Sequence, residues 1–348
     1  MMIRKIRVFL SHYTTFLDRL FILLVVLTLG FGFFFLGLNE FHSQYPAPTL
    51  FATQIHALTW AQSITFLAFS LLFLFYGIYI RKESPHAATF IWGMGLFAWG
   101  ALSNIIIVNG VQSTPFPPID AWLVKADAFF GINIAAMMAW SHEHPLFNRF
   151  FDLAYNSLGY ELFLIPIGLA VFNKRRPLAI FFISYMISLL VGDLIYYFFP
   201  TMAPSGILHS PYFLEAQQHT SQRFYQVHHF LPITAKGDGG LIAFPSYHVI
   251  WAVLLTYTMI EKKLLFYPLV ALNTLIIIST MFLGWHYFSD VISGIVLAIG
   301  SIGIAAWVYR KSSEERGYFT TFKFGRAGGG VEKGGGEPSP SSSSLIEV

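Results

Sequence analysis

Two histidines and one aspartate are the residues of this chain best suited to chemistry. His286 and Asp290 stand four residues apart, so on a helix their side chains share one face. A carboxylate at that spacing accepts a hydrogen bond from one imidazole nitrogen and leaves the other as a nucleophile. His248 follows Ser246, a residue favoured at helix starts, so we expect the free N–H groups of a helix N-terminus around it. Such an end binds phosphate, and the pattern predicts a site that handles phosphoryl groups.

The composition shows what kind of protein must position these residues. Of 348 residues, 55% are apolar and only 11% are charged, whereas about 25% of a soluble domain is charged. This balance excludes a disordered chain and a soluble fold, and it predicts an all-α polytopic membrane protein. The sequence has no cysteine, which excludes disulfides, thiolate catalysis and Cys-ligated zinc.

Eight apolar stretches are predicted to be transmembrane helices, each of which needs roughly 20 mainly apolar residues. The first is followed by no small-residue cleavage pattern, so we expect a retained helix. The predicted spans are residues 20–38, 58–80, 87–109, 154–172, 178–199, 247–260, 264–283 and 288–309.

The basic residues predict how these spans are oriented. With the N-terminus inside, the cytoplasmic segments hold 17 of the 21 Lys and Arg residues, as the positive-inside rule requires. Both termini are therefore expected in the cytoplasm. Three polar clusters, residues 197–204, 239–248 and 284–290, then lie on the periplasmic, extracellular or luminal face. The sequence holds no N-glycosylation acceptor site, which favours a bacterial inner membrane.

The predicted organisation has three parts. Residues 1–109 form the first three transmembrane helices. Residues 110–310 form a catalytic membrane domain, in which an interfacial segment, 110–153, precedes helices four to eight. Its mixed apolar and charged pattern suits helices lying in the membrane interface. Residues 311–348 contain Gly-Gly-Gly repeats and a serine run, and they predict a flexible cytoplasmic tail.

Two short motifs resemble those of a known family. Residues 244–248 read Phe-Pro-Ser-Tyr-His and residues 286–290 read His-Tyr-Phe-Ser-Asp. They resemble the second and third signatures of the type 2 phosphatidic acid phosphatase (PAP2) superfamily. The resemblance covers roughly residues 119–304 and is closest to the branch of inositol phosphorylceramide synthases, or inositolphosphotransferases. Residues 199–204, Phe-Pro-Thr-Met-Ala-Pro, are similar to a proline motif of that branch.

The resemblance implies a PAP2-type helical core and a mechanism without a cofactor. It implies that His286 attacks phosphorus to form a phosphohistidine and that Asp290 orients it. His248 is implied to protonate the lipid leaving group and then to act as a base on the acceptor. That acceptor is either water, in a phosphatase, or a lipid hydroxyl, in a phosphotransferase of sphingolipid or other lipid metabolism.

The sequence departs from the classical superfamily pattern at the phosphate clamp. Arg176 and Pro177 look like the end of the first signature, but Leu169 stands where its lysine belongs. The basic residue ahead of the third-signature histidine is also absent. We therefore expect other groups to bind the substrate: Ser246, Tyr247, Arg223 and Lys236.

Aromatic residues beside the two histidines favour transfer over hydrolysis. Tyr247, Trp285, Tyr287 and Phe288 are of the types that gather where lipid head groups lie. They can shield a phosphohistidine from water while a lipid alcohol enters laterally. Simple hydrolysis of a lipid phosphate remains the alternative at this stage.

Other polar residues leave further alternatives open. Asp193 and Glu161 fall inside predicted spans, where they suit internal partners or the pathway of an amphiphile transporter. Two histidine groups, 142–144 and 228–229, lack a fixed scaffold, and we expect no metal there. A catalytically inactive scaffold is disfavoured because all three catalytic residues are present. The expected partners are a lipid donor, a lipid or water acceptor and the bilayer, with no nucleic acid; the oligomeric state stays open.

Overall fold

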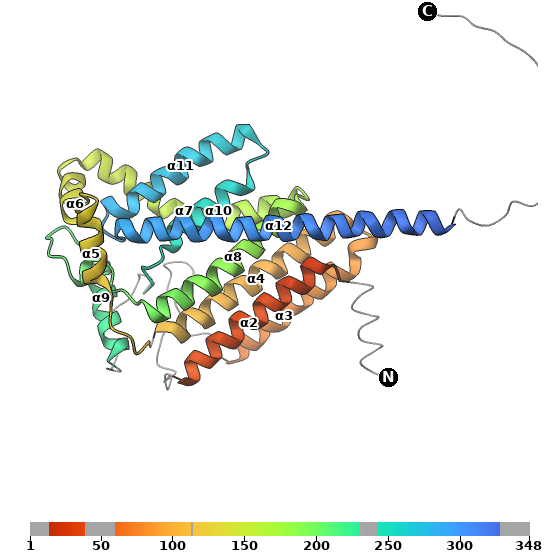
Figure 1. The fold of residues 1–348 in the computed structure, drawn as a ribbon, viewed down its shortest axis with the longest axis horizontal. Coiled ribbons are helices and arrows are strands. Elements are labelled where there is room, and N and C mark those ends of the chain that lie inside the picture. Colours follow the sequence, from red (N-terminus) through yellow and green to blue (C-terminus); the bar gives the residue numbers. More distant parts are fainter. Residues whose placement is uncertain (1–13, 39–59, 113, 230, 232–241, 328–348) are drawn as a thin grey trace, which may run out of the picture. The chain divides into compact units, whose positions relative to one another are not determined.

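The computed structural model describes residues 14–38, 60–112, 114–229, 231 and 242–327, and these form helices joined by loops, with no strand among them (Figure 1). The chain divides into two compact units after Tyr309. The helices are α2 (Phe16–Leu38), α3 (Trp60–Tyr79), η1 (Ile80–Lys82), α4 (Pro85–Gln112), α5 (Asp120–Phe129), α6 (Ile134–Glu143), α7 (Pro145–Val171), α8 (Arg175–Phe198), η2 (Pro204–Gly206), α9 (Glu215–His228), α10 (Tyr247–Thr258), α11 (Lys263–Phe282) and α12 (Phe288–Ala327).

Six of the described helices are long and apolar enough to cross a membrane: α2, α4, α7, α8, α11 and α12. The chain is therefore a multi-pass membrane protein by helix length and composition, but the predicted count of eight is not confirmed. The predicted span 58–80 begins outside the described residues. Helix α10 has only 12 residues, about 18 Å at 1.5 Å per residue, against a hydrocarbon core of about 30 Å.

The segment predicted to lie in the interface forms two short helices and the start of a long one. Helices α5 and α6 meet at an angle of 74°, and as a bent pair they could account for one further span. Helix α7 begins at Pro145, within this segment, rather than at the predicted residue 154. Interfacial placement of α5 and α6 remains a prediction.

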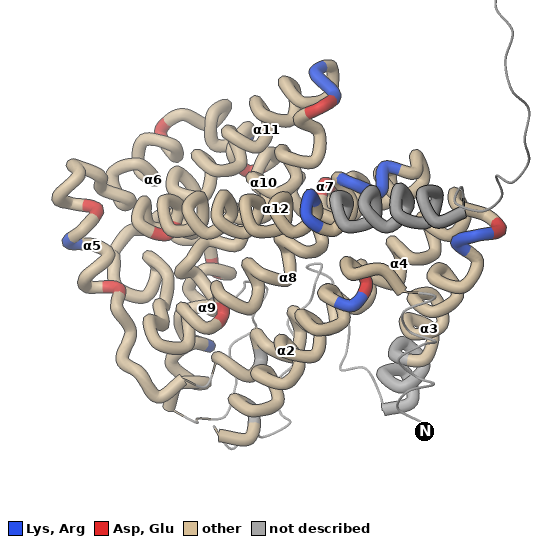
Figure 2. Tube along the Cα trace, turned by 45° about the vertical axis from the view of Figure 1, so that its right-hand side comes forward, with Lys and Arg blue, Asp and Glu red and all other residues tan. Residues whose placement is uncertain are grey.

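Helix α8 is the centre of the bundle. It packs against α2, α4, α7 and α10. In its most apolar 18-residue stretch, 72% is buried inside the protein, compared with 22% in the corresponding stretch of α11. Phe21 of α2 meets Phe182 of α8 edge to face, with ring centroids 6.4 Å apart. Figure 2 shows that Lys and Arg lie mainly near helix ends, while the middle stretches of the long helices carry little charge. This distribution is the one expected of helices surrounded by lipid.

Candidate active site

The turn between α11 and α12 presents His286. Gly284 follows the end of α11 with φ of +76°, a left-handed conformation that glycine adopts without strain. The amide of Gly284 donates to the Met281 carbonyl at 3.0 Å. The amides of Trp285 and His286 both donate to the Thr280 carbonyl, at 2.9 and 3.1 Å. These bonds use carbonyls that a helix end leaves without partners, and they fix the backbone of His286 against the end of α11.

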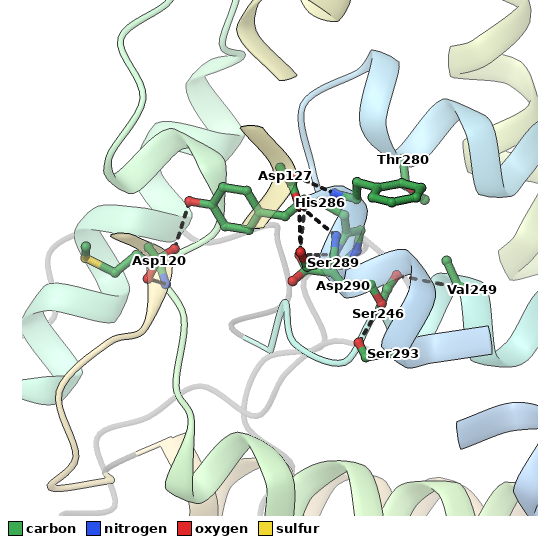
Figure 3. A network of polar contacts seen from close by, with 12 residues as sticks. Asp120, Asp127, Ser246, Val249, Thr280, His286, Ser289, Asp290 and Ser293 are labelled. Atoms are coloured by element: carbon green, nitrogen blue, oxygen red, sulfur yellow. Dashed lines mark hydrogen bonds and ion pairs between the residues drawn. The ribbon is translucent and has the colours of Figure 1, made fainter. Parts of the chain in front are cut away.

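His286 and Asp290 are paired as predicted. Nδ1 of His286 lies 3.3 Å from Oδ2 of Asp290, and the same oxygen accepts the amide of Tyr287 at 2.9 Å (Figure 3). Both side chains are buried. Burial lowers the pKa of His286 to about 4, against an opposing hydrogen bond to the backbone of Ala243. The imidazole is therefore neutral at pH 7, the state that a nucleophile requires.

His248 reaches the same point from the start of α10. The Ser246 side chain caps this helix by accepting the amide of Val249 at 3.4 Å, and the Ser246 amide donates to the Asp290 carbonyl at 3.2 Å. The beginnings of α10 and α12 are thus joined directly. The rings of His248 and His286 lie 5.8 Å apart between centroids, so both can contact one phosphoryl group.

Aromatic rings flank His248. Tyr155 of α7 stacks on His248 at 4.3 Å with an interplanar angle of 19°, and on Trp285 at 5.6 Å and 9°. Trp285 was among the aromatics predicted to line the site. Tyr155 was missed, because an isolated tyrosine in an apolar span has the same appearance whether it packs in a core or against an active site.

The side chain of Tyr247, which we predicted to bind substrate, lies against α8. Its hydroxyl donates to Oδ1 of Asp193 at 2.8 Å and approaches the Leu189 carbonyl at 3.1 Å, and its side chain is buried. Consecutive residues on a helix point about 100° apart, so Tyr247 faces α8 while His248 faces the site. This contact also gives Asp193 an internal partner, which was one of the two roles expected for that residue.

Four further residues were singled out from the sequence: Ser246, Arg223, Lys236 and Glu161. Ser246 is buried as the cap of α10. Arg223 is buried in α9 rather than exposed in a loop, and Lys236 lies outside the described residues. Glu161 is buried and lies 3.5 Å from the Ser157 hydroxyl. In the part of the chain that the structure describes, no group of three His, Asp or Glu side chains is arranged to hold a metal ion.

Two carboxylates of α5 that sequence reasoning missed contact the catalytic segment. Asp120 accepts the Tyr287 hydroxyl at 3.0 Å and the Met202 amide at 2.9 Å. Asp127 accepts the amides of Phe288 and Ser289, at 2.7 and 3.0 Å (Figure 3). The only sequence signal was their spacing of seven residues, which places both on one face of a helix.

The chain matches a known family over the segment that carries this site. A family model described as the PAP2 superfamily matches residues 121–304, a range that contains His248, His286 and Asp290. No curated protein matches the chain, and no solved structure does.

Proposed function

Since the chain belongs to the PAP2 superfamily, whose members are generally phosphatases and phosphotransferases on lipid phosphates, we propose that it moves the phospho-head group of a membrane lipid through a phosphohistidine at His286. The observation that carries the proposal is the pairing of a buried, neutral His286 with Asp290, directly beside His248. These groups supply a nucleophile, the residue that orients it and a general acid–base.

The proposed reaction has two steps at phosphorus. With Nδ1 directed to Asp290, Nε2 of His286 attacks phosphorus while the bond from phosphorus to the lipid oxygen breaks. His248 gives a proton to the departing oxygen. Burial lowers the pKa of His248 in the free protein, and we propose that the bound phosphate, an anion beside the imidazole, raises this pKa so that His248 is protonated at this stage. In the second step, His248 takes a proton from an acceptor hydroxyl, whose oxygen attacks phosphorus as the bond to His286 breaks. Each step leaves the protein ready for the next, and after both it has its original protonation state.

The start of α10 is the group that we propose to hold the phosphate oxygens. Two helices begin at this site, and helix starts attract anions through their amides and their dipole. At α12, however, the amides of Phe288 and Ser289 are already bonded to Asp127. At α10, the Ser246 hydroxyl accepts the Val249 amide, and we propose that the amides of Tyr247 and His248, which precede it in the first turn, bind the phosphate oxygens. Arg223 and Lys236 remain the proposed cationic groups.

Transfer to a lipid hydroxyl is our preferred form of the reaction. The stack of His248, Tyr155 and Trp285 covers one side of the general acid–base with aromatic surface. Such rings exclude water from a phosphohistidine and accept apolar parts of a lipid. An acceptor such as ceramide or diacylglycerol fits this environment. The resemblance to the inositolphosphotransferase branch also favours transfer to a lipid hydroxyl. We further propose that the site opens to the face of the membrane opposite the cytoplasmic termini.

The test uses the full-length protein in vesicles that contain a labelled phospholipid donor, with and without a lipid alcohol acceptor. We expect labelled head group on the added lipid alcohol. His286→Ala should lower turnover by at least about a thousandfold and abolish an acid-labile phosphoenzyme. The matched control is His86→Ala, which replaces an exposed histidine at the start of α4 and should leave the rate unchanged.

Two results would contradict parts of the proposal. Turnover that persists in His286→Ala would show that His286 is not the nucleophile. Label released only as free phosphate or phospho-alcohol, whatever acceptor is supplied, would show that the enzyme is a phosphatase.

A further inference from the structure

Helix α5 carries two buried carboxylates on the face that meets the catalytic segment. Asp120 is 1% exposed and Asp127 is 2% exposed. They are seven residues apart, two helical turns, with the buried Leu123 between them. A carboxylate removed from water is strongly unfavourable unless hydrogen bonds replace the lost hydration. Both therefore require donors, and the donors come from segments far away in the sequence.

Asp127 caps the start of α12. Its Oδ2 accepts the amide of Phe288 at 2.7 Å, and its Oδ1 accepts the amide of Ser289 at 3.0 Å and the hydroxyl of Ser289 at 2.6 Å. First-turn amides have no acceptor within their own helix. The residue just before α12 is Tyr287, whose side chain cannot cap the helix. A carboxylate from another helix takes that role, in charge-assisted bonds stronger than neutral ones.

Asp120 forms a hydrogen bond with Tyr287, the residue just before α12. It accepts the Tyr287 hydroxyl and also the amide of Met202, which lies in the loop after α8. The Ile119 amide adds a bond to the Pro200 carbonyl at 2.9 Å. Helix α5 thus contacts two of the three polar clusters that the sequence predicted to converge.

Phe288 and Ser289, whose amides Asp127 accepts, lie in the sequence between His286, the proposed nucleophile, and Asp290. His286 precedes Tyr287, and Asp290 follows Ser289, so the backbone of residues 287–289 sets the distance from Nδ1 of His286 to Oδ2 of Asp290. That distance is 3.3 Å. Rotation of the first turn of α12 would change this distance. Asp127 opposes such a rotation because it accepts two of the three amides between His286 and Asp290.

We propose that Asp127 is a positioning residue for the phosphoryl reaction: by capping the first turn of α12 it holds His286 and Asp290 in the geometry for attack on phosphorus. This inference rests on the proposed function of His286. Asp127 accepts three donors of the protein itself, so it acts on the orientation of the nucleophile and not on substrate affinity. Its loss should therefore lower kcat and leave KM unchanged.

The experiment measures steady-state rates and the single-turnover rate of phosphohistidine formation, each per folded enzyme. Asp127→Asn has the same shape but puts an amide NH₂ where one acceptor oxygen stood. We expect kcat and the single-turnover rate to fall about tenfold to a hundredfold, the range seen when supporting residues or sub-ångström positions are lost. KM should stay within about twofold.

Two further variants separate positioning from stability. Asp18→Asn removes another buried aspartate, which is bonded to Arg81; it should lower the unfolding temperature without changing kcat per folded enzyme. Ser289→Ala removes one of the three donors to Asp127 and should lower the single-turnover rate about fivefold. If Asp127→Asn does not fold, Ser289→Ala alone decides the question.

The failure of this inference is distinguishable from that of the proposed function. A wild-type protein that forms no acid-labile phosphoenzyme would overturn both. A wild-type protein that forms it, with unchanged single-turnover rates in Asp127→Asn and Ser289→Ala, would overturn the positioning role only.

Discussion

Replacing Gly294 by alanine should slow the reaction without unfolding the protein. Gly294 lies on α12 where this helix passes the start of α10. An added Cβ would stand 2.8 Å from the Ser246 carbonyl oxygen and 3.1 Å from the Cβ of Val249. Ordinary contact begins near 3.4 Å. The Ser246 carbonyl belongs to the backbone and cannot rotate away, so the two helices must separate.

The size of the effect follows from these distances. Relief of the contact requires a separation of about 0.6 Å, the difference between 3.4 and 2.8 Å. The movement acts on Ser246, two residues from His248, and against the bond from the Ser246 amide to the Asp290 carbonyl. Because a misplacement of about 1 Å can lower an enzymatic rate about a hundredfold, we expect a reduction of about tenfold.

The assay is head-group turnover per folded protein, with Gly303→Ala as the matched control. Gly303 lies on the same helix, and a Cβ added there meets nothing within 4 Å. Both variants gain the same helix propensity, so a difference between them reports the contact with α10. Equal rates in Gly294→Ala and Gly303→Ala would refute the reasoning that the approach of α12 to α10 sets the geometry of the site.

Two other predictions concern protonation and topology. Burial lowers the pKa of His286 to about 4, so this residue is neutral above that pH and charged below it. We therefore expect the acid limb of kcat/KM to have its midpoint near pH 4. A midpoint near the ordinary histidine pKa of about 6.5 would contradict a buried His286. Because the chain has no cysteine, single substitutions can report sidedness: Glu143→Cys and Glu215→Cys should react with an impermeant reagent from outside the cell, whereas Glu83→Cys and Glu261→Cys should react only after permeabilisation. Labelling of all four from one side would contradict the predicted orientation.

Much of the helical framework was predictable because apolar runs of sufficient length have few alternatives in a membrane. The approach of His248, His286 and Asp290 was predictable as well, because each motif stands at the end of a long apolar run. The two helix starts are joined by the bond from the Ser246 amide to the Asp290 carbonyl, a main-chain contact that no residue type reveals. The short length of α10 was predictable too, since the predicted span 247–260 begins at the same residue as the helix and ends two residues after it.

The supporting carboxylates could not be predicted for a similar reason. Asp127 bonds mainly to backbone amides 161 and 162 residues away, and any residue type offers such amides. Two acids seven residues apart in a short helix with Lys125 between them look like a solvated surface. The contact of Tyr247 with Asp193 could not be predicted either, because the motif fixes the place of Tyr247 in the sequence, while the direction of its side chain depends on a neighbouring helix.

The balance of charge at the site bears on the class of substrate. Asp120, Asp127 and Asp290 are all buried around one short segment, and the hydrogen bonds described for each carboxylate come from the protein's own amides, hydroxyls and imidazole. A phosphate bound at His286 meets Asp290, the acid that contacts this histidine, and the start of α10, whose dipole is equivalent to about half a positive charge. A lipid phosphomonoester carries nearly two negative charges at pH 7, because its second pKa is about 6, whereas a phosphodiester carries one. The smaller charge is easier to accommodate there, which favours, within the proposed function, a phosphodiester head group as the donor.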